Sequence, residues 1–309
     1  MKARVSVVVT VVLGLGLWQT LLMSEVVFID ITPSPLVHNH SAMEVQIETH
    51  VKLCNLTEVE NGAWRNGSWE PPSGCVLRAD LELLRQKNVT FIWTGNSIMR
   101  HTFFRLGELM AGKHRGVVDY EGREEEKMKC NKDPEQGECS CQIPVHRGDN
   151  TTTYYCFIWQ QEWIDDRLRA TWDRKIADGT EVYMVMNAGL VWAWHEGLNS
   201  VQRMQAQLPS LLDWCKSLPN KVKLIYTQST HTLRPHWDEA VLAQNAVMSA
   251  QFPRHDPRMT LLNLWPTSSA AIDYVDDNHF SGRTVEANID VILHVFLNWD
   301  AVVLPLSGI

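Results

Sequence analysis

The chain has 309 residues, of which 45% are hydrophobic and 21% charged, a composition ordinary for one large or two small globular domains. The formal net charge of -8 argues against a nucleic-acid-binding protein, because such proteins usually carry a basic face. Thirteen tryptophans are unusual. Surface tryptophans can stack on sugar rings, although packing in the core is their more common role.

Residues 1–24 are expected to form a signal anchor. Two basic residues precede an uncharged stretch from Val5 to Ser24, and about 20 such residues span a bilayer. Because the basic residues lie before the stretch and acidic residues follow it, the rest of the chain is expected outside the cytosol. A cleaved signal peptide is the alternative, but the stretch is long for one and no clear small-residue cleavage site follows. Residues 25–50 are predicted to be a stem.

Potential glycosylation and disulfide sites also favour the secretory pathway. Four N-x-S/T sequons begin at Asn55, Asn66, Asn88 and Asn150. In an oxidising compartment most of the seven cysteines are expected to pair, and the odd count leaves one free or intermolecular. Cys139-Ser140-Cys141 lacks the second ligand pair of a structural zinc site, so no metal site is predicted. The expected location is the Golgi membrane as a single-pass type II protein with a lumenal domain, or alternatively secretion.

Strand and helix patterns alternate after residue 80. Residues 51–80 look like a loop-rich cap held by a disulfide, and residues 111–153 like a charged, cysteine-rich loop. Short apolar runs predict strands at Val89–Thr94, Tyr154–Gln160, Glu181–Asn187, Lys221–Thr227 and Thr260–Trp265. Apolar residues at helical spacing predict helices at Ser97–Met110, Val201–Leu218, Trp237–Phe252 and Ser281–Leu297.

This alternation predicts an α/β fold, a three-layer α/β/α sandwich with a mostly parallel sheet, over residues 51–300, followed by a tail at 301–309. Ligands of such open sheets bind beyond the carboxyl ends of the strands. Four loops are expected to meet at that edge: Gly95–Ser97, Asn187–Trp194, Gln228–Pro235 and Pro266–His279.

Ser97 lies where the first strong strand is expected to meet its helix. A serine at this place commonly caps the helix. It can also be a nucleophile if a base removes its proton. Asp276 and His279 stand three residues apart before the last helix, and an imidazole held by a carboxylate is the base that serine needs. Asn187 ends another predicted strand at the same edge. Its carboxamide is either an oxyanion donor or part of a turn with Gly189.

These residues, taken in order, resemble a known family. Gly95-Asn96-Ser97, Asn187 and Asp276-x-x-His279 resemble the blocks of the SGNH (GDSL-type) hydrolase superfamily. More narrowly, the chain looks like the PC-esterase group, which includes plant trichome-birefringence-like polysaccharide O-acetyltransferases and the animal sialic-acid O-acetyltransferase. Three segments carry this closer resemblance over roughly residues 64–297: Trp69–Leu77 with W-x-P-x-x-C, Gly95–Arg100 with GDS-x-x-R, and Asn187–Trp192 with N-T-G-H-W-W.

The resemblance implies Ser97 as nucleophile, His279 as general base and Asp276 as its orienting partner, with Asn187 and the Ser97 backbone N–H binding the oxyanion. Arg100, Trp192 and Trp194 are further candidates for substrate binding, and Arg100 is as well placed to face solvent. Two positions depart from the family pattern. Asn96 stands where the family usually has Asp, and the glycine of the second block is not identified, with Gly116 and Gly122 as candidates.

The expected function is O-acyl, specifically O-acetyl, transfer to a glycan or polysaccharide through a serine acyl-enzyme. A carbohydrate O-acetyl esterase with the same triad is one alternative. The other is a glycan-binding protein of the secretory pathway that keeps the fold without catalysis. No cofactor is predicted. The acyl donor is open, with acetyl-CoA or an acetylated partner as candidates, and the expected partners are a carbohydrate and the membrane.

Overall fold

The computed structural model describes residues 5–10, 24–29, 52–72, 74–115, 130, 138–147, 151–160, 166–271, 273–280 and 282–304. The chain divides into two compact units, Met1–Lys52 and Leu53–Ile309. In the first unit, β1 (Val5–Thr10) and β2 (Ser24–Ile29) pair antiparallel. The strand β1 therefore lies within the predicted anchor. Among the described residues no helix is long and apolar enough to cross a membrane, and the rest of the predicted anchor and most of the stem lie outside them.

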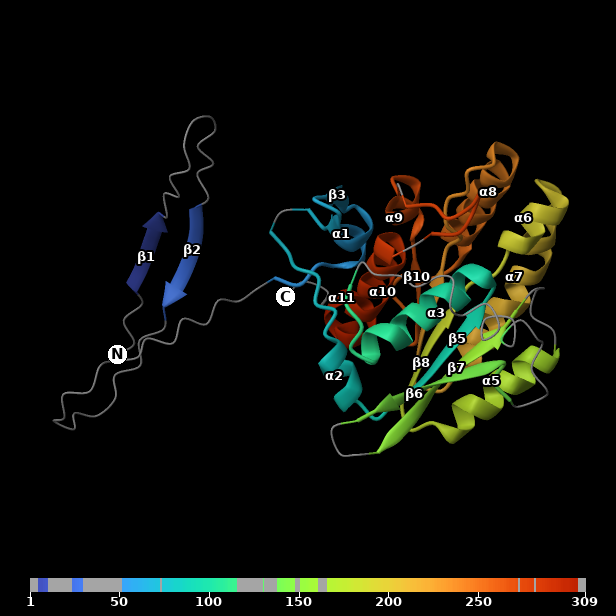
Figure 1. Ribbon diagram of the computed structural model, residues 1–309, viewed down its shortest axis with the longest axis horizontal. Coiled ribbons are helices and arrows are strands. Elements are labelled where there is room, and N and C mark those ends of the chain that lie inside the picture. The colour runs from blue at the N-terminus through green and yellow to red at the C-terminus, as the bar shows by residue number, and fades with distance from the viewer. Residues whose placement is uncertain are drawn as a thin grey trace. The chain divides into compact units, whose positions relative to one another are not determined.

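A six-stranded, mostly parallel sheet forms the centre of the second unit (Figure 1). Its strand order is β10-β9-β8-β5-β7-β6, and only β6 runs antiparallel to its neighbour. The strands are β5 (Thr90–Gly95), β6 (Cys141–His146), β7 (Thr152–Trp159), β8 (Val182–Met186), β9 (Val222–Thr227) and β10 (Met259–Leu262). All five residues of β8 are buried, as the continuous apolar run of a doubly covered parallel strand requires.

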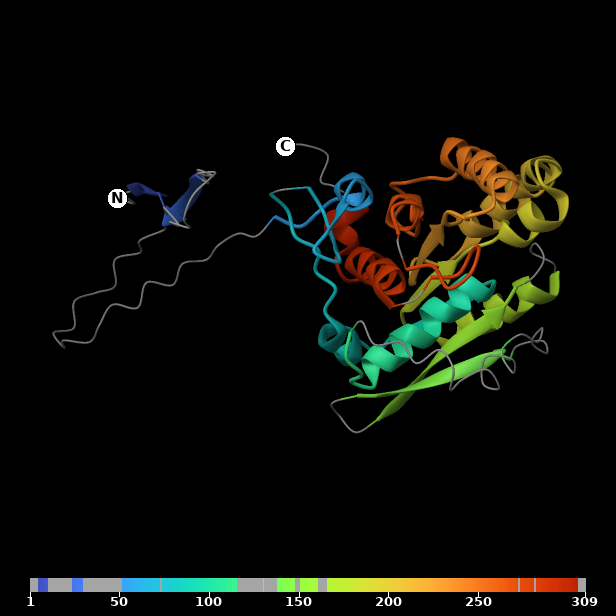
Figure 2. The same ribbon diagram turned by 45° about the horizontal axis from the view of Figure 1, so that its top comes forward.

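Helices cover both faces of this sheet. The main ones are α3 (Ser97–Met110), α5 (Asp166–Asp178), α7 (Asn199–Ser217), α8 (Pro235–Gln251) and α10 (Gly282–Leu297). The apolar residues of α3 and α10 share one core cluster with β5, and those of α5 and α7 share a second cluster on the opposite face. Figure 2 shows the blue-green α3 and the red α10 side by side. The predicted α/β architecture of helices around a mostly parallel sheet is confirmed.

The N-terminal cap consists of short elements held together by side chains. It contains α1 (Leu56–Glu60), β3 (Ala63–Arg65), β4 (Ser68–Glu70) and α2 (Leu81–Gln86). The Cys54–Cys75 disulfide staples it. His294 of α10, which is fully buried, accepts a hydrogen bond from the backbone N–H of Arg78 at Nδ1 and donates from Nε2 to the carbonyl of Cys54, each at 2.8 Å. The cap is therefore fastened directly to α10.

Two further disulfides lie at the β6 edge of the sheet, Cys130–Cys141 and Cys139–Cys156. Both cysteines of the Cys139-Ser140-Cys141 segment are paired, and no cluster of metal-ligating side chains occurs among the described residues. The remaining cysteine, Cys215, is free, and burial raises the pKa of its thiol to about 12, so it is an unreactive core residue.

Several elements differ from the sequence prediction. The region 111–153 was expected to be a loop but contains β6. The residues of β6 alternate between buried and exposed, as in an edge strand with one face in solvent. Its Pro144 argued against a strand in the sequence, although proline is tolerated in edge strands. The helix α5 was missed because its sequence is strongly polar, and the short helices α6 (Leu190–Glu196), α9 (Trp265–Ser269) and α11 (Trp299–Val302) were missed as well. Val303 is fully buried, so the core extends beyond the predicted boundary at residue 300.

The order of the strands determines where a site can form. The chain passes from β5 to β7 on one side and then returns to β8 on the other side of β5. The connections that leave the carboxyl ends of the neighbouring strands β5 and β8 therefore run in opposite directions, towards β7 and β9 respectively, and a crevice at such a switch point is where open α/β sheets bind ligands. Residue 97 follows that end of β5 directly.

Candidate active site

The junction between β5 and α3 presents Ser97 at the edge of the sheet. Gly95 has φ of +153°, and a Cβ there would lie 2.7 Å from Cγ of Met99, so the turn requires glycine. Asn96 is the N-cap of α3, because its Oδ1 accepts the backbone N–H of Ile98 at 3.0 Å. Ser97 is the first helical residue. Its hydroxyl is therefore not needed as a cap, and this corrects the capping alternative.

Ser97, His279 and Asp276 form a continuous chain of hydrogen bonds. The Ser97 Oγ lies 2.7 Å from Nε2 of His279, and Nδ1 of the same ring lies 2.7 Å from Oδ2 of Asp276. A carboxylate can only accept, so Nδ1 carries the imidazole proton and Nε2 presents its lone pair to the serine hydroxyl. This arrangement of hydroxyl, imidazole and carboxylate is the one that activates a serine nucleophile.

The Asp276 carboxylate also shapes the turn that carries the histidine. Its Oδ1 accepts the backbone N–H groups of Asn278 and His279, each at 2.9 Å. Burial raises the pKa of Asp276, but the Asn278 N–H and the bonds from His279 outweigh burial and lower the pKa below its usual value. The carboxylate therefore stays ionised at the pH values at which the imidazole acts as a base.

The loop from residue 273 to 280 is anchored to its surroundings. Asp273 accepts from the backbone N–H of Thr284 at 3.1 Å, in the first turn of α10. The backbone N–H of Leu233 donates to the carbonyl of Asp277 at 2.7 Å, and the Arg234 guanidinium pairs with the Asp277 carboxylate. The first two contacts hold the loop that carries the imidazole in place, as a preorganised base requires, and the exposed ion pair adds little to them.

The three side chains are open to solvent to different degrees. The side chain of Asp276 is 52% exposed and that of His279 is 18% exposed, whereas Ser97 is half-buried. A substrate can therefore approach the serine from outside, and water has access to the same place.

A second histidine, which sequence reasoning missed, lies against the first. The rings of His101 and His279 have centroids 4.8 Å apart and are tilted by 33°. Nη2 of Arg100 lies 3.3 Å from Nε2 of His101, and because a guanidinium only donates, this nitrogen accepts. His101 is four residues after Ser97, so helical spacing alone places both on one face of α3 and would have indicated it.

Arg100 and the two tryptophans of α6 occupy different environments. Arg100 is 7% exposed and its guanidinium lies over the Trp159 ring at 5.5 Å, so it faces the protein and not the solvent. Trp192 is only 4% exposed beneath Arg203, which removes its ring from any surface. Trp194 is 55% exposed and stacks on His195. Of the two tryptophans, only Trp194 is placed to meet a substrate.

Asn187 is held by hydrogen bonds on both sides of its carboxamide. Its Oδ1 accepts from Nδ2 of Asn96 at 3.3 Å, and its Nδ2 donates to the carbonyl of Thr227 at 2.9 Å. One of the two amide hydrogens is thus committed. The backbone N–H of Ser97 lies in the first turn of α3, where N–H groups have no acceptor within the helix.

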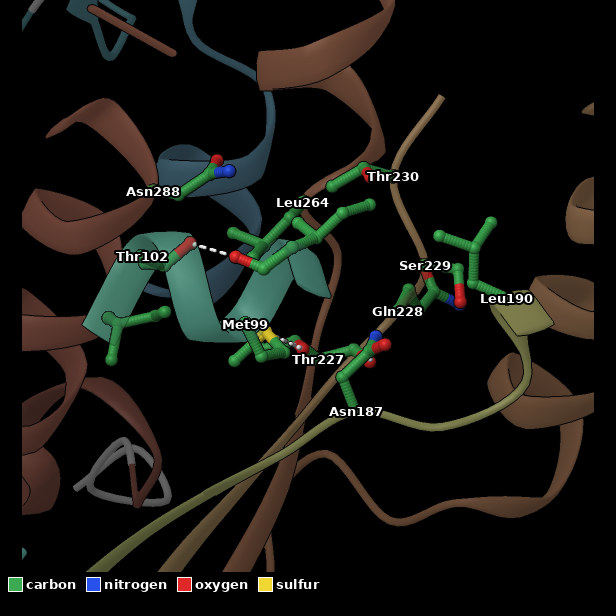
Figure 3. Close-up of a pocket in the computed structure, with 12 residues that line it drawn as sticks. Met99, Thr102, Asn187, Leu190, Thr227, Gln228, Ser229, Thr230, Leu264 and Asn288 are labelled. Carbon is green, nitrogen blue, oxygen red and sulfur yellow. Dashed lines mark hydrogen bonds between the residues drawn. The ribbon is translucent and has the colours of Figure 1, made fainter. Parts of the chain in front are cut away.

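A small pocket adjoins these residues. Figure 3 shows Asn187, Thr227 and Ser229 from the carboxyl ends of β8 and β9 facing Met99 of α3. Ile98, the neighbour of Ser97, also lines it. Asn187 and Thr227 therefore form part of one wall, and Asn187 is hydrogen-bonded to Asn96 in the turn that presents Ser97.

The remaining predicted positions lie partly at the surface. Asn55, Asn66 and Asn88 are exposed, as an attached glycan would require. Asn150 and both candidate glycines of the second block, Gly116 and Gly122, lie outside the described residues.

No protein-family model matches the chain, and no curated protein sequence matches it. Among solved structures, it is similar to a carbohydrate esterase family 3 from Talaromyces cellulolyticus, at 12% identity and a TM-score of 0.38, over 68% of this chain and 97% of that chain. A TM-score this low supports no conclusion about fold or function, so the proposals below depend on the residues of this chain.

Proposed function

We propose that the chain is a serine-dependent acyl-ester enzyme that acts on O-acetyl groups of carbohydrates. The observation that carries this proposal is the hydrogen-bond chain from Ser97 through His279 to Asp276, with 2.7 Å at each of its two links. The resemblance of the sequence blocks to the PC-esterase group supports acetyl groups on sugars as the substrate class.

In the proposed reaction, Nε2 of His279 takes the proton of Ser97 as Oγ attacks the acyl carbonyl carbon. The oxyanion accepts hydrogen bonds from the Ser97 backbone N–H and from the second amide hydrogen of Asn187. The tetrahedral intermediate collapses, and the leaving sugar oxygen receives the proton from His279. A sugar hydroxyl or a water then attacks the acyl-serine and gives its proton to His279, which returns it to Ser97.

Transfer to a glycan is the first candidate and hydrolysis is the second. Both share the acyl-enzyme, and they differ only in the acceptor. The partial exposure of Ser97 is compatible with hydrolysis, because water has access to the acyl-serine. The experiment that separates them incubates the protein with an acetylated glycan and an excess of an isotope-labelled free glycan. Label-bearing acetylated product indicates transfer, free acetate alone indicates hydrolysis, and neither product from the wild type refutes both.

We also propose a lumenal location, in the Golgi, with the N-terminal segment as a single-pass type II anchor. The three disulfides support an oxidising compartment, and the exposed Asn55, Asn66 and Asn88 are compatible with glycosylation. Sensitivity of the expressed protein to a glycosidase, together with its partition into the membrane fraction after carbonate washing, tests this location. A protein without glycans, or one released by the wash, contradicts it.

A further inference from the structure

A second pocket lies beside α10, away from the pocket of Figure 3. Its cavity volume is about 330 Å³, at the lower end of the range of pockets that bind small molecules. Its lining includes Trp64, Asn66 and Gly67 of the cap, and Arg283 and Asp290 of α10. Neither the proposed reaction nor any predicted disulfide, metal or cofactor uses it.

The helices α3 and α10, which pack against each other, extend from the neighbourhood of the triad to this pocket. At the start of α3, Ser97 and His101 contact His279, which lies three residues before α10 begins. Further along, Nε of Arg105 on α3 donates to Glu286 of α10 at 2.9 Å, and Glu286 lines the pocket. The two helices thus run alongside each other from the triad to the pocket.

The pocket begins close in the chain to the triad histidine. Arg283 lies four residues after His279, and Asp290 lies seven residues beyond Arg283. At 1.5 Å per helical residue, the lining from Arg283 to Asp290 covers about 10 Å of α10. Four residues of chain span at most about 14 Å, so Arg283 lies within reach of an oligosaccharide whose acetylated unit is at Ser97.

One cation of the pocket has no partner of opposite charge. Both guanidinium nitrogens of Arg115 bond the two Asp290 oxygens at 2.7 Å, so this pair is neutral. The Glu286 carboxylate is likewise matched by Arg105. Arg283 is exposed, and in the part of the chain that the structure describes no carboxylate lies within ion-pairing distance of it. The lining has two arginines and two carboxylates, and of these four only Arg283 lies outside an ion pair in the part of the chain that the structure describes.

The cap holds the rest of the pocket in place around this charge. Asn66 and Gly67 form a tight turn with φ of +50° and +79°, and a Cβ on Gly67 would lie 2.3 Å from Nη1 of Arg283. The glycine therefore lets the guanidinium lie against the turn. Trp64 is only partly buried, and its Nε1 donates to the carbonyl of Thr267 at 3.0 Å, which fixes the orientation of the ring.

We propose that this pocket binds a carboxylate-bearing sugar residue of the glycan substrate. Arg283 pairs with the carboxylate through two parallel hydrogen bonds, and the Trp64 ring packs against the apolar face of the sugar. Its role as a substrate subsite rests on the proposed function. The binding preference itself does not, and it defines a substrate class: glycans with an acidic residue next to the acetylated one.

The test measures equilibrium binding to the Ser97→Ala variant, which excludes turnover. The ligands are a trisaccharide of galacturonic acid and the matching trisaccharide of galactose. We expect the acidic trisaccharide to bind at least tenfold more tightly. Arg283→Gln is expected to abolish that difference and to leave binding of the neutral trisaccharide unchanged, and Arg283→Lys to restore only part of it.

Arg174→Gln is the matched control, because Arg174 is exposed on α5, on the opposite face of the sheet. It removes the same charge and is expected to change nothing. Equal binding of the two trisaccharides, or equal losses in Arg283→Gln and Arg174→Gln, would overturn the proposal. Absence of Ser97-dependent acetyl turnover in the wild type, with the binding preference intact, would instead refute the proposed function alone.

The glycan predicted at Asn66 is the other candidate occupant, since Asn66 lines the pocket. The binding measurement is therefore made on the protein as secreted and after enzymatic removal of its N-glycans. We expect both preparations to bind the acidic trisaccharide equally. Binding only after deglycosylation would show that the protein's own glycan fills the pocket, and it would contradict the subsite.

Discussion

Replacing Asp276 by asparagine tests the role of the carboxylate without removing its turn. Asparagine keeps an oxygen that accepts the backbone N–H groups of Asn278 and His279, each now at 2.9 Å from Oδ1. The group that faces Nδ1 of His279, however, becomes an amide that donates. Nδ1 must then accept, and the imidazole proton moves to Nε2, where it prevents that nitrogen from taking the Ser97 proton.

The size of the effect follows from the exposure of this carboxylate. The same change at a buried triad aspartate lowers kcat by about 10⁴-fold. Because the Asp276 side chain is 52% exposed, water partly replaces the lost acceptor, so we expect a loss of about 10³-fold. At about 1.36 kcal/mol per tenfold, this is about 4 kcal/mol of activation free energy. The melting temperature should stay within a few degrees of wild type.

The assay is acetate release from an acetylated sugar, with kcat and KM measured separately. Asp277→Asn is the matched control. It removes the same charge from the neighbouring residue, whose exposed ion pair with Arg234 is worth about 1 kcal/mol or less. We expect a change of less than threefold in kcat for that variant. An Asp276→Asn protein with more than half of wild-type kcat, or equal losses in both variants, would refute the reasoning.

Two further predictions concern Asn96 and His294. Asn96→Asp keeps the helix cap but turns a carboxylate oxygen towards Oδ1 of Asn187, where an amide now donates at 3.3 Å. It should cost about 1–3 kcal/mol of unfolding free energy and lower kcat, whereas an unchanged melting curve and activity would contradict the network. Burial lowers the pKa of His294 below its usual value of 6.5, so as the pH falls the unfolded chain binds the proton first. The contribution of the neutral His294 to the free energy of unfolding is therefore fully present above pH 6.5. Below that pH it decreases by up to about 1.4 kcal/mol per pH unit. Urea unfolding between pH 7.5 and 5 should show a smaller slope for His294→Gln, and identical slopes would exclude His294 as the cause.

Strands and long helices were largely predictable because local sequence determines them. The run Glu181–Asn187 is apolar on both faces, a pattern typical of a parallel strand that helices cover on both sides. The helix Ser97–Met110 begins and ends where its apolar spacing predicts. Edge elements were not predictable in this way. The β6 strand owes its place to pairing with β7 and to two disulfides, and these depend on residues distant in sequence.

In the candidate site, too, the features that depend on nearby residues were predictable and those that depend on tertiary packing were not. Asp276 and His279 are three residues apart, so their contact follows from one turn, and Ser97 joins them because parallel strands end at a common edge. The N-cap residue of α3 was less easily assigned, since asparagine and serine, at positions 96 and 97, both favour the N-cap position of a helix. The pocket beside α10 could not have been found from sequence, because Trp64 and Arg283 meet only through the packing of the cap on α10.

The central claim is that Ser97 is a nucleophile activated by His279. The most direct measurement is covalent labelling with a fluorophosphonate, with the modified peptide identified by mass spectrometry. The account predicts one label on Ser97 in the wild type, none at this position in Ser97→Ala, and labelling slowed by at least 100-fold in His279→Ala. A wild-type protein that is not labelled and releases no acetate, or labelling at Ser97 that proceeds as fast without His279, would contradict it.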